Sequence, residues 1–119
     1  MGRKLSIELR RLVAERASHL CEYCLINEAN TFYGCEVDHI ISIKHGGSSH
    51  IDNLAYACAS CNRAKGSDVG SISATGEFIR FFNPRTDDWA EHFRLQDAVI
   101  QPITAVSYTH LTLPTNREV

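Results

Sequence analysis

Several features of exported and membrane-bound proteins are missing from this chain of 119 residues. The first 20 residues are charged throughout and contain no continuous apolar stretch, so they do not resemble a secretory signal peptide. No apolar run approaches the roughly 20 residues needed to cross a bilayer. We therefore expect a protein of the reducing cytoplasm that does not bind or span a membrane.

An excess of positive charge is also missing. The formal net charge is −2 and the sequence pI is about 6.3, so the global charge gives no support for nucleic-acid binding. The basic residues are unevenly spread, because residues 1–16 carry five Arg or Lys against two Glu. Any contact with phosphate groups must therefore come from local basic residues and bound cations.

Cysteine is present in an odd number, five, and four of these residues form two C-x2-C pairs. The pairs are Cys21–Cys24 and Cys58–Cys61, separated by 33 residues. In a reducing compartment, such pairs bind metal more often than they form disulfides, and two pairs complete the closed tetrahedral shell of a structural Zn2+ site. Since a closed shell leaves no position for water or substrate, we expect this zinc to stabilise the fold only. A thioredoxin-like redox site would use a single C-x2-C pair, so the presence of two pairs disfavours it. The fifth cysteine, Cys35, is expected to be a buried strand residue.

The hydrophobic pattern predicts a small number of short elements. Apolar residues between positions 5 and 20 recur at helical spacing, with Ser6 as N-cap and a helix end just before the first cysteine. Residues 35–41 are rich in Val and Ile and predict a strand, and "LAYAC" predicts a second one. "ASCNRAKG" predicts a helix that stops at Gly66.

The C-terminal third contains an aromatic cluster and an unusual tail. No basic residues interleave regularly with the aromatic side chains, so we expect them to pack and not to read bases. The cluster comprises Phe78, Phe81, Phe82, Trp89 and Phe93. "SYTHLTLPTNREV" resembles a translated cloning or sequencing adaptor, and residues 107–119 are expected to be a non-native or disordered tail. Residues 1–106 then form one domain with its core at 21–66.

Asp38 and His39 lie inside an apolar, strand-like run, where a charged group must be paired, hydrogen-bonded or bound to metal. Gly46 and Gly47 follow them closely. These glycines permit a turn with positive φ, or allow a DNA backbone to approach, and the sequence leaves both explanations open.

The stretch "VDHIISIKHGGSSHIDNLAYACASCNRAKG" resembles the HNH endonuclease signature, in which D-H-I, G-G, N-L and C-x-x-C-[HN] are followed by a lysine. The resemblance is close over residues 21–66 and extends over roughly residues 5–105, where the chain is similar to small bacterial members with a four-cysteine zinc site. It implies an α+β fold: a small zinc-stapled ββα-metal domain with an N-terminal helix and a C-terminal aromatic-rich extension.

The resemblance also implies roles for individual residues. Asp38 and Asn62 correspond to the ligands of a catalytic divalent ion, His39 to the general base, and Asn53 to the residue that orients the loop and His39. Asn62 stands at the third motif position, where the family pattern also allows histidine, and an oxygen ligand there favours Mg2+ or Mn2+. The implied reaction leaves 5′-phosphate and 3′-hydroxyl ends.

Basic residues near these positions are candidates for nucleic-acid binding, with a solvated side chain as the alternative for each. They are Lys44, His45, Arg63 and Lys65.

The sequence thus predicts a metal-dependent DNA endonuclease with DNA as its partner. The alternative is a zinc-stapled nucleic-acid-binding module without catalytic activity, for which the net negative charge is the best argument in the sequence. A complete set of Asp38, His39, Asn53 and Asn62 favours the enzyme, since a binding module has no need of it. A deaminase is disfavoured because no H-x-E motif accompanies the cysteine pairs.

Overall fold

The architecture is a small α+β fold built around a two-stranded ribbon, as seen in a computed structural model that describes residues 5–97 and 99–111. Three antiparallel pairs, β1–β2, β3–β4 and β5–β6, are its sheets within that part of the chain. Helices of the described residues are all too short or too polar to cross a membrane. The elements are α1 (Ile7–Arg16), η1 (Glu28–Asn30), β1 (Cys35–His39), η2 (Ile43–His45), η3 (Ile51–Asn53), β2 (Leu54–Cys58), α2 (Ala59–Lys65), β3 (Gly70–Ile72), β4 (Phe78–Arg80), α3 (Trp89–His92), β5 (Phe93–Gln96), β6 (Val99–Pro102) and α4 (Ala105–Leu111).

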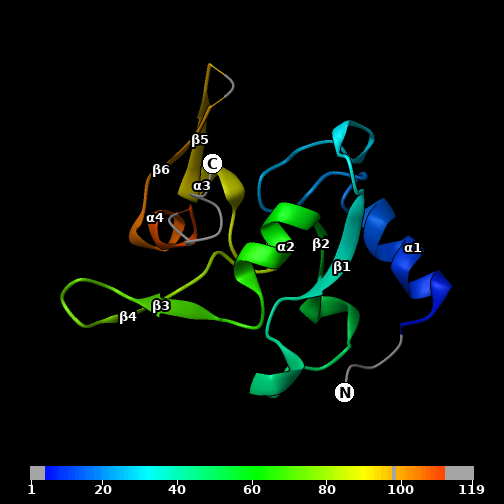
Figure 1. Cartoon of the computed structure of the whole chain (residues 1–119), viewed down its shortest axis with the longest axis horizontal. Helices are drawn as coiled ribbons and strands as arrows, with labels where there is room; N and C mark the ends of the chain where they lie inside the picture. The colour runs from blue at the N-terminus through cyan, green and yellow to red at the C-terminus, as the bar shows by residue number, and fades with distance from the viewer. Residues whose placement is uncertain (1–4, 98, 112–119) are drawn as a thin grey trace.

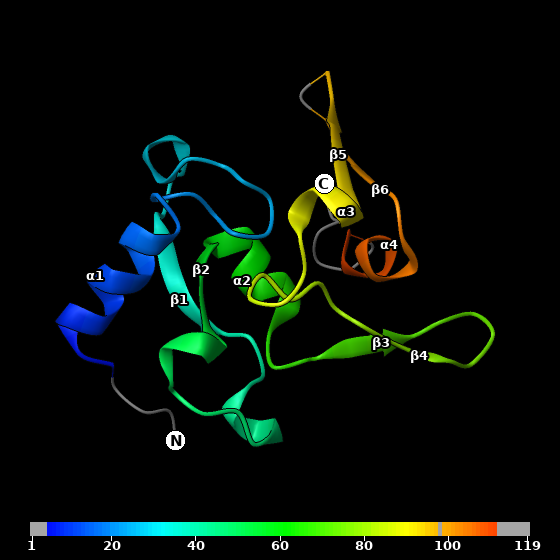
Figure 2. The same cartoon turned by 180° about the vertical axis from the view of Figure 1, so that it is seen from behind.

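The β1–β2 ribbon lies between α1 and α2, as Figure 1 shows and Figure 2 shows from behind. All five residues of β2 are buried, and the side chains of residues 54–57 alternate between two apolar clusters. Leu54 and Tyr56 pack with α1, whereas Ala55 and Ala57 pack with the cysteines and the C-terminal aromatic residues. This alternation fixes the register in which Asp38 lies opposite Ala55.

The first helix begins as predicted and ends earlier. The Ser6 side chain accepts a hydrogen bond from the Leu9 amide at 3.0 Å, which confirms the N-cap. The helix ends at Arg16, because Ser18 and His19 adopt left-handed φ values of 55° and 61°. The chain must turn there so that the following knuckle can bring its two cysteines back to the ribbon.

The ribbon and second helix match the predicted positions closely. Strand β2 and helix α2 have the predicted bounds, and Gly66 ends the helix with φ 54°. Strand β1 ends at His39, two residues early, because the Asn53 side chain takes both backbone groups of Ile41.

The C-terminal part contains two hairpins that the hydrophobic pattern did not predict. Its aromatic residues pack as expected, with Phe82 and Phe93 buried and Trp89 stacked on Phe93. The Trp89 indole donates to the Tyr23 carbonyl at 3.0 Å, which ties this part to the knuckle. Phe78 is the exception, because its side chain on the projecting β3–β4 hairpin is 57% exposed.

The expected loose tail begins inside a helix. Residues 107–111 belong to α4, where Ser107 and His110 are buried and His110 stacks on Tyr23. Residues 112–119 lie outside the described residues. A domain boundary at residue 106 and a non-native origin of the tail stay predictions.

Glycine is required for a different reason at each of the two positions in the loop after β1. Gly46 adopts φ 88° at the end of η2, a conformation that other residues rarely take. A Cβ atom on Gly47 would lie 1.7 Å from the carbonyl oxygen of Ile41. Close backbone packing therefore accounts for Gly47 without an approaching DNA strand.

Replacing Gly47 with alanine should lower the free energy of unfolding by roughly 2 kcal/mol or more, because the clash is with backbone. Gly46→Ala is the matched comparison, with open space around its Cβ and a cost of about 1 kcal/mol from φ alone. Urea unfolding of both variants measures the difference, and equal losses would contradict the close-packing explanation.

Candidate functional site

The four cysteines of the C-x2-C pairs come together in one cluster. Their Sγ atoms all lie within 4.8 Å of one another, and the Cys24 and Cys58 sulfurs are 3.8 Å apart. A tetrahedral Zn2+ with bonds of about 2.3 Å requires sulfur separations of about 3.8 Å. The donor set and its spacing therefore fit zinc, and four thiolates complete the shell.

The cluster joins segments that are distant in sequence. Cys21 and Cys24 lie in the knuckle after α1, Cys58 ends β2, and Cys61 lies in the first turn of α2. A hydrogen bond from Cys24 lowers the pKa of the Cys21 thiol to about 7. Cys35 pairs with Cys58 across the ribbon but stands outside the cluster, and burial raises the pKa of its thiol to about 12.

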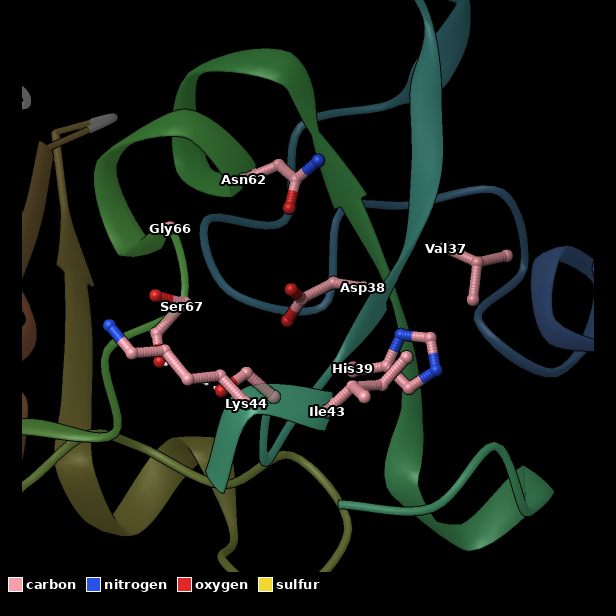
Figure 3. Close-up of a pocket in the computed structure, with 9 residues that line it drawn as sticks. Val37, Asp38, His39, Ile43, Lys44, Asn62, Gly66 and Ser67 are labelled. Atoms are coloured by element: carbon pink, nitrogen blue, oxygen red, sulfur yellow. Dashed lines mark hydrogen bonds between the residues drawn. The ribbon is translucent and has the colours of Figure 1, made fainter. Parts of the chain in front are cut away.

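A second site is an open cleft of about 330 Å3 at the end of β1. Helix α2 and the loop containing η2 form its other walls, as Figure 3 shows. Three of the residues singled out in the sequence, Asp38, His39 and Asn62, line it together. The full lining is Val37, Asp38, His39, Ser42, Ile43, Lys44, Asn62, Gly66 and Ser67.

Asp38 is a buried carboxylate with one side already occupied. Its Oδ2 atom accepts a hydrogen bond from the Tyr23 hydroxyl at 2.9 Å and lies 3.3 Å from the Lys65 ammonium. Burial raises the pKa of Asp38, and the Lys65 charge and the Tyr23 hydrogen bond oppose that shift. Both contacts engage Oδ2, which leaves Oδ1 as the oxygen to offer to a ligand.

Asn62 approaches the same carboxylate from α2. Its amide nitrogen donates to Glu36 Oε1 at 3.4 Å, and this contact sets which end of the amide faces the cleft. In Figure 3 the amide oxygen is turned toward the side of the cleft that holds Asp38. A carboxylate and an amide oxygen are donors that Mg2+ and Mn2+ accept, and Mg2+ commonly keeps several waters beside one or two protein ligands. The residues therefore fit such an ion.

His39 follows Asp38 directly and points to the opposite side of β1, as neighbours on a strand do. The ring is half-buried, and its Nε2 atom lies 3.0 Å from the Ser49 hydroxyl. That contact holds the ring in one orientation at the rim of the cleft.

Asn53 lies outside the cleft and holds the loop that forms its wall. Its side chain accepts from the Ile41 amide at 2.9 Å and donates to the carbonyls of Ile41 and Ser48 at 3.0 and 2.7 Å. Ser49, the partner of His39, follows Ser48 directly. These contacts agree with a loop-orienting role for Asn53, which reaches His39 through Ser49.

The four basic candidates separate into two groups. Lys44 lines the cleft, and His45 and Arg63 are exposed nearby in sequence on η2 and α2. Lys65 differs from the expectation, because its side chain is only 2% exposed and contacts Asp38. A phosphate cannot reach an ammonium group enclosed in this way, so Lys65 is no longer a candidate for phosphate binding.

Three polar partners of the site were not recognised in the sequence: Tyr23, Glu36 and Ser49. Nothing about these residue types predicts a hydrogen bond to a distant side chain. The place of Lys65 was readable in principle, since it lies three positions after Asn62 and so on the same side of α2.

Cys61→Ser should lose the zinc, which is expected at one ion per chain, and should unfold at much lower temperature. The reason is that the binding free energy of a structural zinc contributes directly to folding. Metal analysis and circular dichroism measure both effects. Cys35→Ser is the matched control and should keep its zinc, whereas a zinc content unchanged in Cys61→Ser would contradict the four-cysteine site.

Comparison with known proteins bears on both sites. Residues 21–68 match the family model described as HNH endonuclease, a segment that contains both cysteine pairs and the cleft residues Asp38, His39 and Asn62. No curated protein and no solved structure gives a match. Members of this family are typically nucleases, which implies a nucleic acid as partner. Residues 21–68 therefore form a segment of the HNH endonuclease family, and this segment carries a four-cysteine cluster of the kind that binds zinc.

Proposed function

We propose that this protein is a metal-dependent DNA endonuclease that hydrolyses phosphodiester bonds. The observation that supports it best is that Asp38, Asn62 and His39 all line one open cleft, with the carboxylate and the amide oxygen on one side of β1 and the imidazole at the rim. Asp38 and Asn62 would hold Mg2+ or Mn2+, and His39 would act as general base. The zinc cluster would stabilise the fold without taking part in the reaction.

The side-chain chemistry of each cleft residue suits it to a particular role in the proposed reaction. A divalent ion, when bound, supplies stabilisation of the negative charge on the phosphate and the departing 3′ oxygen. Asp38 and Asn62 would hold it through the Oδ1 atom and the amide oxygen, and the Tyr23 hydroxyl keeps the carboxylate in place through its hydrogen bond to Oδ2. The cleft opens to solvent, and a sugar–phosphate backbone would enter it from there.

His39 needs one free ring nitrogen to accept a proton from the attacking water. In the tautomer that donates from Nε2 to Ser49 Oγ, the Nδ1 atom carries the lone pair. This tautomer is the one that suits a general base. Asn53 supports it indirectly by fixing Ser48 and hence Ser49.

Local charge compensates for the negative chain. Lys44 lies in the cleft wall, and His45 and Arg63 are exposed on the two elements beside it. We propose these three for contacts with DNA phosphates on either side of the cleaved bond.

A second candidate function is a nucleic-acid-binding module of the same fold without catalysis. The observation that keeps it open is the Lys65 ammonium group 3.3 Å from Asp38, which already provides the buried carboxylate with a positive partner in place of a divalent ion. Its discriminating feature is the cleft itself, because binding alone would not require Asp38 and Asn62 on one side of β1 and His39 at the rim.

The wild-type protein should nick or cut plasmid DNA with Mn2+ or Mg2+, and His39→Ala should lower the rate by roughly 100-fold or more. Agarose-gel assays with increasing metal measure this, and resealing of the nicks by DNA ligase without kinase treatment tests for 5′-phosphate and 3′-hydroxyl ends. His50→Asn, an exposed histidine outside the cleft, is the matched control. Equal background cleavage in wild type and His39→Ala would refute the nuclease proposal and leave the binding module.

Lys44→Ala should weaken DNA binding and reduce the slope of log Kd against log salt by about 1, because one phosphate contact is removed. Fluorescence anisotropy on the His39→Ala background measures binding without cleavage. Arg94→Ala, an exposed arginine on β5, should leave the slope unchanged. The same salt slope for His39→Ala alone and for its combinations with Lys44→Ala and Arg94→Ala would contradict a phosphate contact by Lys44.

A further inference from the structure

Lys65 is a buried cation with two neighbouring partners. It is the last residue of α2, and its side chain is 2% exposed beside the 5% exposed Asp38. Its ammonium group lies 3.3 Å from Asp38 Oδ2 and donates to the main-chain carbonyl of His39 at 3.0 Å. Taking a lysine out of water is costly, and burial of this kind needs a charged partner in return.

One ammonium group thus contacts both residues on which the proposed reaction depends. It holds the side chain of Asp38 and the backbone of His39, so it fixes the distance between them. Asn62 lies three residues earlier on the same side of α2 and turns its amide oxygen toward the side of the cleft that holds Asp38. The helix therefore presents an amide oxygen and a positive charge to a single carboxylate.

We propose that Lys65 is a positioning residue that acts as a built-in counter-cation for Asp38, keeping the divalent-ion site formed before the ion arrives and restricting Asp38 to one free oxygen. This inference rests on the ion site of the proposed function. Because Lys65 and Tyr23 both engage Oδ2, Oδ1 is the oxygen through which Asp38 would hold the ion.

The charge has a second consequence for the ion. A fixed positive charge beside the carboxylate repels a divalent cation, so Lys65 weakens binding while it preserves geometry. Without Lys65, a buried carboxylate would stand with only the Tyr23 hydroxyl as partner until an ion arrived. Removal of Lys65 therefore raises the affinity of the site for the ion, but Asp38 and His39 are no longer held in position before the ion binds.

Lys65→Met in the full chain, with its zinc retained, tests this inference. Without Mn2+ its Tm should fall by roughly 10 °C or more, because the buried charge of Asp38 loses its partner. Added Mn2+ should then raise the Tm by more than in the wild type, and the Kd for Mn2+, measured from the electron paramagnetic resonance of free Mn2+, should fall roughly tenfold. At saturating Mn2+, cleavage should still be at least roughly tenfold slower, because His39 has lost its backbone anchor.

Arg94→Met is the matched control, since it removes a positive charge at an exposed position on β5 and should change neither Kd nor Tm. A merely structural Lys65 would give the same fall in Tm with and without Mn2+, together with an unchanged Kd. That result would overturn the inference.

A pair of further variants applies if Lys65→Met does not fold. Asp38→Asn removes the carboxylate charge that Lys65 balances, so the double variant Asp38→Asn/Lys65→Met should fold and show a cooperative melting transition. A double variant that stays as unfolded as Lys65→Met, while Asp38→Asn alone folds, would overturn the counter-cation role.

Asp38→Asn also separates the two proposals. Mn2+ binding lost in Asp38→Asn and unchanged in Lys65→Met overturns the inference about Lys65 alone. Mn2+ binding as tight in Asp38→Asn as in the wild type overturns the ion site, and the inference with it.

Discussion

The four-cysteine cluster is the constraint on which the rest of the structure depends. It joins the knuckle after α1 to the junction of β2 and α2. Helix α2 starts at that junction, so its direction across the ribbon is set there, and its next turn carries Asn62 to the level of Asp38. A chain of this size has a modest core, and a metal cluster supplies an attachment that apolar packing alone would provide poorly.

Buried charge is the second organising feature. Asp38 lies on a strand whose partner, β2, is fully buried, and the apolar surroundings would not hold a carboxylate unless polar groups met it. Tyr23 comes from the knuckle and Lys65 from α2, so the same cluster that positions these two segments also delivers the partners of the carboxylate. The four-cysteine cluster and the electrostatics of the cleft are connected in this way through the fold.

The loop after β1 uses backbone packing where the cleft needs a rigid wall. Gly47 lies against the Ile41 carbonyl, and the Asn53 side chain bonds both backbone groups of that same residue. The result is a loop whose two sides are fastened to each other, with Ser49 held in place for His39. Precision at the rim of the cleft comes from these few contacts and not from a regular element.

Local signals in the sequence were sufficient for the elements next to the site. The Ser6 cap, the strand "LAYAC" and the helix ending at Gly66 were all predictable, because capping, alternation and glycine act over a few residues. The spacing of the cysteine pairs, and the HNH signature between them, likewise determined the family and the zinc-type cluster. Helical spacing places Lys65 on the same side of α2 as Asn62. Only the tertiary structure decided that Lys65 is a buried partner of Asp38 and not a surface cation, since its ammonium group contacts the Asp38 carboxylate and the His39 carbonyl on a strand 26 residues earlier, and no local pattern encodes that contact.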